Sequence, residues 1–268
     1  MKLAIGIPVC GRLERTKGQW GCLLESMLYG EREETPLLVV DNSSTEEYAA
    51  WLVRHVAAKY PGVFHLHRNL ANAGVPASLN RLAKMARDAG ADAVCLLHND
   101  LFVYERGWLG RVARLFGDDP HAGVIGFAGA RSCAANGGRE GFMSALLEAE
   151  SHGERIYGGH RRCAVLDGLA LCCRLSMLRE VGGFDEGYPP HHFYDKDVCL
   201  AAHERGWVNW VLPVNCHHES GITASSPEYL DWVADVMGTG PADGDGKAHR
   251  EAEARFLSKW RHRLPLTF

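Results

Sequence analysis

Short apolar runs alternate with longer amphipathic segments over the first hundred residues of the chain. The runs predict strands at residues 3–9, 36–40, 63–66 and 93–97, and the segments between them predict helices at residues 18–29, 45–60 and 75–89. Most of the runs are apolar throughout, which is typical of parallel strands that are covered on both faces. The alternation predicts an α/β fold with a Rossmann-like, mostly parallel sheet flanked by helices.

The middle of the chain interrupts this alternation. Residues 131–162 are rich in Gly and in charged side chains, which predicts a long excursion that acts as a mobile lid. Regular structure is predicted to return with helices at residues 175–181 and 195–205 and a strand at residues 208–212.

The end of the chain predicts two amphipathic helices, at residues 227–236 and 248–261, joined by a flexible Gly-rich turn. We therefore expect one α/β domain over residues 1–226 and a C-terminal helical extension over residues 227–268. The apolar stripe of the first of these helices is expected to pack on the core.

Composition and charge narrow the function classes. Of the 268 residues, 46% are hydrophobic and 23% are charged, which excludes a disordered or collagen-like chain. The formal net charge of −4 gives no basic footprint, so no nucleic-acid partner is expected. Nine cysteines without a CxxC pair disfavour zinc ribbons and thioredoxin-like redox motifs.

The sequence predicts neither a membrane span nor a secreted protein. No apolar stretch reaches the length of a membrane span and the N-terminus does not resemble a signal peptide, so we expect a cytoplasmic protein, either free or peripheral at the inner membrane face.

Two nucleotide-binding enzyme classes are also disfavoured. The first predicted strand is followed by no GxGxxG, and no P-loop motif occurs, which disfavours dinucleotide oxidoreductases and P-loop NTPases.

Polar side chains follow the predicted strands where they end. Asp41 follows the second strand, Asn69 the third, and His98-Asn99-Asp100 the fourth. Ligands of parallel sheets bind at the carboxyl ends of the strands, so this recurrence predicts a crevice for a polar ligand. Each residue taken alone is better interpreted as a turn former or helix cap, and only the recurrence favours a ligand site; for Asp100 a metal-binding role and a backbone-capping role both stay open.

Two later groups carry further candidates. Asp195 and Asp197 stand at the start of a predicted helix, where they either cap the helix or supply a base that activates an acceptor. His217 and His218 follow a predicted strand and are either ordinary loop residues or metal ligands.

Seven motifs occur in a specific order: IPVCGR, VVDNSST, NLANAG, LLHND, GGFDE, YDKDVCLAAHERG and CHHESG. In this order and spacing, residues 3–220 resemble the family 2 glycosyltransferases of the GT-A fold, and among them the rhamnosyltransferase-like branch most of all. The resemblance implies an inverting enzyme that moves a sugar from a nucleotide-diphospho-sugar to an acceptor hydroxyl and depends on Mn²⁺ or Mg²⁺.

The resemblance also implies roles for single residues. Pro8 and Asp41 would contact the base and ribose of the donor, with Asn69 and Gly74 lining the same pocket. The segment His98-Asn99-Asp100 takes the place of the family's Asp-x-Asp, so Asp100 would reach the metal ion, with His217 or His218 as a further ligand. An imidazole at His98 in place of an acid either weakens the metal site or favours a softer ion such as Mn²⁺.

On the acceptor side of the reaction, Asp195 matches the family's catalytic base, and Tyr194 stands where an acid commonly precedes that base. Asp167 and Gly168 fall where the family contacts the donor sugar or the acceptor.

The resemblance leaves the substrates open. UDP-sugars are the commonest donors of the family, followed by dTDP- and GDP-sugars, and the acceptor is a glycan or a small molecule; a homodimer is also compatible with the sequence. Two rival functions remain. A nucleotidyltransferase is disfavoured because no Gly-rich basic loop follows the first strand, and a catalytically impaired sugar-nucleotide-binding protein has only His98 in its support.

Overall fold

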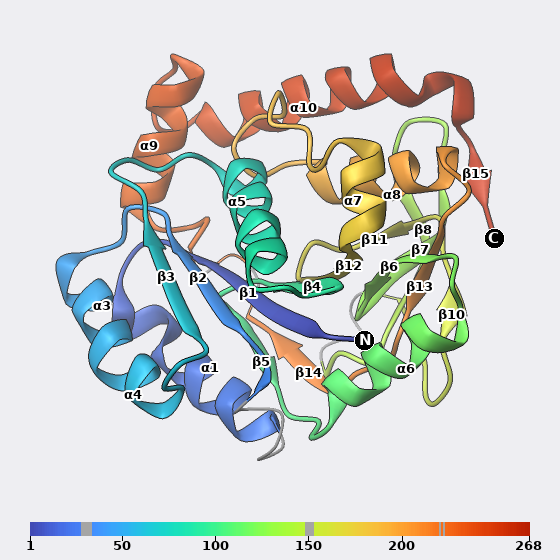
Figure 1. Cartoon of the computed structure of the whole chain (residues 1–268). Coiled ribbons are helices and arrows are strands. Elements are labelled where there is room, and N and C mark those ends of the chain that lie inside the picture. Colours follow the sequence, from blue (N-terminus) through green and yellow to red (C-terminus); the bar gives the residue numbers. More distant parts are fainter. Residues whose placement is uncertain (28–33, 148–152, 220, 222) are drawn as a thin grey trace.

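A computed structural model describes residues 1–27, 34–147, 153–219, 221 and 223–268. Its centre is an eight-stranded sheet in the order β10-β13-β6-β12-β4-β1-β2-β3 (Figure 1). Strands β4, β1, β2 and β3 run parallel to one another and β6 runs parallel to β13, whereas β12 is antiparallel to both of its neighbours. The sheet comprises β1 (Leu3–Val9), β2 (Leu37–Asp41), β3 (Phe64–Arg68), β4 (Ala93–Leu97), β6 (Ala122–Gly126), β10 (Arg161–Arg162), β12 (Ala170–Arg174) and β13 (Val208–Val211).

Helices cover both faces of this sheet (Figure 1). One face packs against α1 (Leu13–Ser26), α3 (Glu46–Trp51), the π-helical turn Leu52–Val56, α4 (Ala57–Lys59) and α6 (Trp108–Asp118). The other face packs against α5 (Val75–Asp88), α7 (Leu175–Val181), α8 (Tyr194–Glu204) and α10 (Gly244–Trp260). Successive residues of β1 enter opposite layers, with Ile5 on the α1 side and Ala4 on the α5 side. The runs that form β1, β2 and β4 are therefore strands buried on both faces, as predicted, whereas β3 at the sheet edge is only partly buried.

A second, smaller sheet corrects one prediction. It contains β7 (Ala128–Cys133), β8 (Arg139–Ser144), β9 (Glu154–Arg155), β11 (Val165–Leu166) and β15 (Leu266–Thr267). The expectation of a long loop over residues 131–162 is therefore wrong over much of that range, and residues 148–152 lie outside the described part. Charged residues are tolerated in this hairpin because some positions of β7 and β8 are open to solvent, among them Arg131 and Glu140.

Other boundaries shift by a few residues. The helix expected at residues 18–29 begins at Leu13, and residues 28–29 lie outside the described part. The helix expected from Ala248 begins at Gly244, because this glycine packs against the backbone of α9 (Pro227–Met237); a Cβ there would lie 2.7 Å from Ala234 Cα.

The last forty residues pack onto the rest of the chain. Tyr229 and Val233 of α9 form a small apolar cluster with Ala248 of α10. Phe256 and Trp260 of α10 belong to the larger core cluster on the face of the sheet that α5 covers. The short helix Arg261–Arg263 then leads into β15, which pairs with β7. The division at residue 226 stays a prediction.

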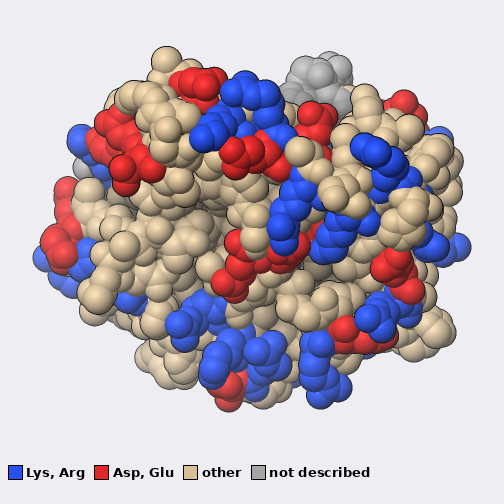
Figure 2. Space-filling model, turned by 90° about the horizontal axis from the view of Figure 1, so that it is seen from above, with Lys and Arg blue, Asp and Glu red and all other residues tan. Residues whose placement is uncertain are grey.

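On the face of the molecule that is at the top in Figure 1, basic and acidic side chains are interspersed in small groups (Figure 2). This mixture agrees with the mild net charge of the chain. Among the described residues, no helix has the length and apolarity needed to cross a membrane.

Candidate active site

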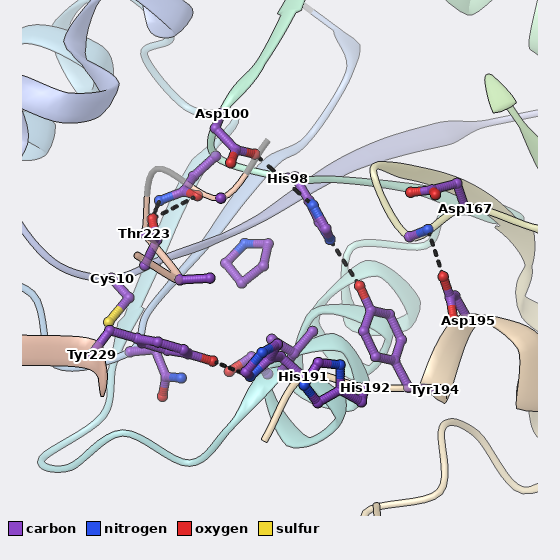
Figure 3. A pocket seen from close by; sticks show the side chains of 18 of the residues that line it. Cys10, His98, Asp100, Asp167, His191, His192, Tyr194, Asp195, Thr223 and Tyr229 are labelled. Atoms are coloured by element: carbon purple, nitrogen blue, oxygen red, sulfur yellow. Dashed lines mark hydrogen bonds and ion pairs between the residues drawn. The ribbon is translucent and has the colours of Figure 1, made fainter. Parts of the chain in front are cut away.

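A cavity of about 370 Å³ opens where β1 and β4 end, and α9 and α10 contribute to its wall. It is lined by eight of the residues singled out from the sequence, several of which are labelled in Figure 3: Pro8, His98, Asn99, Asp100, Asp167, Gly168, Asp195 and His218. We call its residues Pro8, Asn42, His98, Asn99 and Asp100 the sheet side, and His191, His192, Tyr229 and His249 the helix side.

Three side chains on and beside the sheet side can hold a metal ion. His98, Asp100 and His218 each offer one ligand atom, and these atoms lie within 4.8 Å of one another. Asp100 Oδ1 lies 3.1 Å from His218 Nε2 and 3.9 Å from His98 Nδ1. This is a set of two imidazoles and one carboxylate, a donor set typical of transition-metal sites that leave positions open to substrate.

Strand pairing decides which histidine of the 217–218 pair joins this group. β14 (Cys216–His218) runs antiparallel to β5 (Leu101–Val103), with His218 opposite Leu101 and His217 opposite Phe102. Neighbouring side chains of a strand point to opposite faces. His218 therefore turns to Asp100, whereas the ring of His217 lies 6.0 Å from that of Phe102 and does not line the cavity.

The protonation states suit a cation. Burial lowers the pKa of His98, so its imidazole is neutral and available as a ligand near neutral pH. Burial alone would raise the pKa of Asp100, but the hydrogen bond from His218 and the neighbouring His98 outweigh it and hold the pKa below its usual value. His98 Nε2 is 2.8 Å from the hydroxyl of Tyr194, which leaves Nδ1 facing Asp100. The residues present thus fit a divalent ion.

Asp195 lies in the first turn of α8 and is buried at the far wall of the cavity. Its Oδ2 accepts hydrogen bonds from Arg139 and from the backbone amide of Gly168 at 2.9 Å, and its Oδ1 accepts from its neighbour's amide, Lys196 N, at 2.8 Å. Arg139 also pairs with Asp167 at 3.1 Å. Burial alone would raise the pKa of Asp167, but the neighbouring Arg139 guanidinium helps to hold the pKa below its usual value. One guanidinium thus fixes two carboxylates in the wall.

Tyr194 connects the metal-capable group to the Asp195 wall. Its hydroxyl bonds His98, and its ring passes over Gly168, where a Cβ would lie 2.9 Å from Tyr194 Cζ. Gly168 is therefore required for this approach. The two positions at which the sequence departs from the family pattern, His98 and Tyr194, are in contact with each other.

Three residues expected at the donor pocket lie behind its lining. Asp41 is buried and is held by Ser44 N at 2.7 Å and by Arg68 Nε at 3.1 Å. Asn69 donates to Asn42 Oδ1 at 3.0 Å, and it is Asn42 that lines the cavity. Gly74, at φ 80°, lies against the backbone of Pro190. Direct donor contacts by Asp41, Asn69 and Gly74 stay predictions.

Two parts of the site were not expected from the sequence. Arg139 lies in the segment expected to be a loop, and the helix side comes from the turn before α8 and from α9 and α10. Burial lowers the pKa of His191 to about 4, with the neighbouring His192 adding to the effect, and burial also lowers the pKa of His192. The consecutive histidines were the one available signal for this side.

Comparison with known proteins gives the context of the site. The sequence model described as "Glycosyl transferase family 2" matches residues 5–175, which is more than half of the chain. No curated protein sequence matches the chain.

Solved structures are similar at low identity. The mannosyltransferase PcManGT from Pyrobaculum calidifontis, in complex with GDP-Man and Mn²⁺, has a TM-score of 0.59 at 16% identity, over 97% of this chain and 71% of that chain. GalNAc-T7 with UDP, GalNAc and Mn²⁺ has a TM-score of 0.64 at 11% identity, over 97% of this chain but only 56% of that longer chain. S. aureus TarS 1-349 in complex with UDP-GlcNAc has a TM-score of 0.54 at 14% identity, over 98% and 74%. The fold is GT-A, as the sequence predicted.

Proposed function

The chain belongs to glycosyl transferase family 2, and we propose that it is an inverting, metal-dependent enzyme that transfers a sugar from a nucleotide-diphospho-sugar to an acceptor hydroxyl. The observation that carries the proposal is the convergence of a metal-capable group and a buried carboxylate, Asp195, on one cavity. The sheet side receives the donor and the helix side faces the acceptor.

The donor is held over the ends of β1 and β4. His98, Asp100 and His218 would hold Mn²⁺, for which an imidazole-containing set is better suited than for Mg²⁺. When bound, the ion neutralises the charge that develops on the leaving nucleoside diphosphate. Pro8, Asn42 and Asn99 line the part of the cavity beside this group and are placed to contact the nucleoside. UDP-sugars are the first donors to test, followed by GDP- and dTDP-sugars.

Asp195 acts as the general base. It takes the proton of the acceptor hydroxyl while the acceptor oxygen bonds to the anomeric carbon and the bond from that carbon to the diphosphate oxygen breaks. One displacement inverts the configuration at this carbon, and no covalent bond to the protein forms. Arg139, Gly168 N and Lys196 N hold the carboxylate in a single orientation, which is the preorganisation that such a step requires.

One observation favours the rival, a protein that binds sugar nucleotides without turnover. Asp195 Oδ2 already accepts from two donors, Arg139 and Gly168 N, and Oδ1 accepts from Lys196 N, so an acceptor hydroxyl has to compete with donors that are already in place.

A donor screen separates the two. The protein is incubated with Mn²⁺ and a panel of sugar nucleotides, with and without candidate acceptor sugars, and free nucleoside diphosphate is measured. We expect release from one donor, its loss on chelation with EDTA and its recovery on addition of Mn²⁺. Binding of a sugar nucleotide without release, across all acceptors, would support the rival. The same assay on Asp100→Asn tests the metal-capable group, since this variant should lose release at Mn²⁺ concentrations that saturate the wild type.

A further inference from the structure

A second group of metal-capable side chains lies on the helix side of the cavity. His191 and His192 belong to the turn before α8, and Asp245 lies in the first turn of α10. Their ligand atoms lie within 4.8 Å of one another, and the group shares no residue with His98, Asp100 and His218. Asp245 also lies beyond residues 5–175 that match the family and beyond the motifs of the family pattern.

The geometry of this group is convergent. His191 Nε2 and His192 Nε2 approach the same oxygen, Asp245 Oδ1, at 2.9 Å and 3.0 Å, and the centroids of the two rings are 4.1 Å apart. Ligands bound about 2.0–2.1 Å from a tetrahedral Zn²⁺ stand about 3.3 Å from one another. The two N–O distances therefore need to lengthen by only a few tenths of an ångström to match the spacing of ligands around such an ion.

A further contact orients the first ligand. Tyr229 Oη lies 3.0 Å from His191 Nδ1 (Figure 3). The other ring nitrogen, Nε2, is the one that approaches Asp245. Metal-binding histidines are commonly fixed in this way through their second nitrogen. His249 follows Asp245 by one helical turn on the same face of α10, and its ring contacts that of His192 with centroids 4.9 Å apart.

The chemistry of the set favours a transition metal. Imidazoles bind metals through an unprotonated ring nitrogen, and both histidines direct Nε2 at the same carboxylate oxygen of Asp245. Two imidazoles and one carboxylate suit Zn²⁺, whereas Mg²⁺ and Ca²⁺ require oxygen ligands.

We propose that His191, His192 and Asp245 form a second metal site, which binds Zn²⁺ and clamps the start of α10 to the turn before α8. This turn leads directly into Phe193, which has a positive φ of 63°, and into Asp195. An ion at this position fixes the helix side against the segment that carries the proposed base. The site does not depend on the proposed transfer reaction, because its residues bind the ion without any substrate.

The test counts bound ions on the full chain. Purified protein is stripped of metal, titrated with Zn²⁺ alone and analysed for zinc after desalting. We expect two equivalents for the wild type, one for Asp245→Ala and one for Asp100→Ala. Asp243→Ala is the matched control: it removes a neighbouring carboxylate that pairs with Arg250 at 3.2 Å, and it should keep both equivalents.

A melting experiment separates loss of the site from loss of the fold. Zn²⁺ should raise the Tm of Asp100→Ala, in which only the second site remains, and should leave the Tm of the Asp100→Ala/Asp245→Ala double variant unchanged. Two equivalents in Asp245→Ala, or none in Asp100→Ala with an intact melting transition, would overturn the second site. Failure of the donor screen would leave these counts unaffected, so the two proposals fail separately.

Discussion

The two sides of the cavity are built in different ways. The sheet side comes from the ends of neighbouring strands, so the register of β4, β1 and β2 alone brings Pro8, Asn42 and Asp100 to one edge. The helix side depends on packing between segments that are distant in sequence, with His191 before α8, Tyr229 on α9 and His249 on α10.

The two sides therefore differ in how freely their residues can vary between related proteins. A sheet edge is fixed by topology, and ligands of open α/β sheets bind at the carboxyl ends of the strands. A wall made of packed helices is free to vary between relatives, because no ladder of backbone hydrogen bonds fixes it. We therefore expect changes on the sheet side to alter donor and metal binding, and changes around α8 to alter transfer.

The largest expected effect tests this division directly. Asp195→Asn removes the base while keeping the shape of the side chain, so turnover should fall by about 10²–10⁴-fold with no change in the Kd for the nucleotide. Nucleoside diphosphate release and calorimetric titration measure the two quantities. Asp118→Asn, on the exposed surface of α6, is the control and should behave as the wild type. Near-normal turnover of Asp195→Asn would remove the base assignment.

Tyr194, at the start of α8, contacts His98 on the sheet side, and the next prediction removes this contact. Tyr194→Phe removes the hydroxyl that orients His98, so the affinity for Mn²⁺ should fall by about 10–100-fold. The control is Tyr188→Phe, which removes a hydrogen bond to Asp197 outside the cavity and should leave Mn²⁺ affinity unchanged. Equal affinities in both variants, measured by metal titration, would show that Tyr194 does not position the ligand.

The next prediction concerns the packing of Gly168 against the ring of Tyr194. Gly168→Ala places a Cβ against the Tyr194 ring, so the free energy of unfolding should fall by about 1–3 kcal/mol in urea titration. Gly117→Ala is the matched control: it lies in α6 with open space around it, and removing a helical glycine should stabilise by about 0.5–1 kcal/mol. Similar effects of the two substitutions would mean that Tyr194 moves freely.

The smallest effect concerns the anchoring of α10. Asp185, in the GGFDE motif, pairs with Arg255 at 2.8 Å. Burial alone would raise the pKa of Asp185, but the hydrogen bond from Arg255 lowers it by more, so the pKa lies below its usual value of 3.8. Because the folded-state pKa is lowered, the pairing stabilises above pH 3.8 and its contribution is lost as the pH falls through the folded-state value.

Asp185→Asn should therefore reduce the free energy of unfolding by about 0.5–1 kcal/mol at pH 7, since the partner side chain is partly exposed. The difference from the wild type should shrink as the pH falls below 3.8, as measured by urea titration at a series of pH values. A difference that stays constant down to pH 3 would contradict the role of the ion pair.

Sequence patterns predicted the sheet well, because short apolar runs that end in polar residues are typical of strands buried on both faces. Strands β1 and β4 and helix α7 have the predicted bounds, and the polar strand ends do meet at one cavity. The choice between His217 and His218 could not be made from the sequence, since it depends on the register of β14 against β5.

The partner of Arg139 and the second metal-capable group could not be predicted for a related reason. Nothing in the sequence near Arg139 indicates a carboxylate partner, because Asp195 comes to it only through packing of α8 against the second sheet. In the same way, Asp245 lies in a Gly-rich turn pattern that favoured a flexible segment, and its two histidine partners are more than fifty residues away.

The pairing of β15 with β7 has a consequence for the order of folding. Leu266 pairs with Cys133, Cys133 pairs with Arg139, and Arg139 holds Asp195. During synthesis the strands of the sheet side leave the ribosome long before the residues of β15. A nascent chain is therefore able to assemble its nucleotide-binding edge early, while the frame around the proposed base is completed only when residues 266–267 have been added.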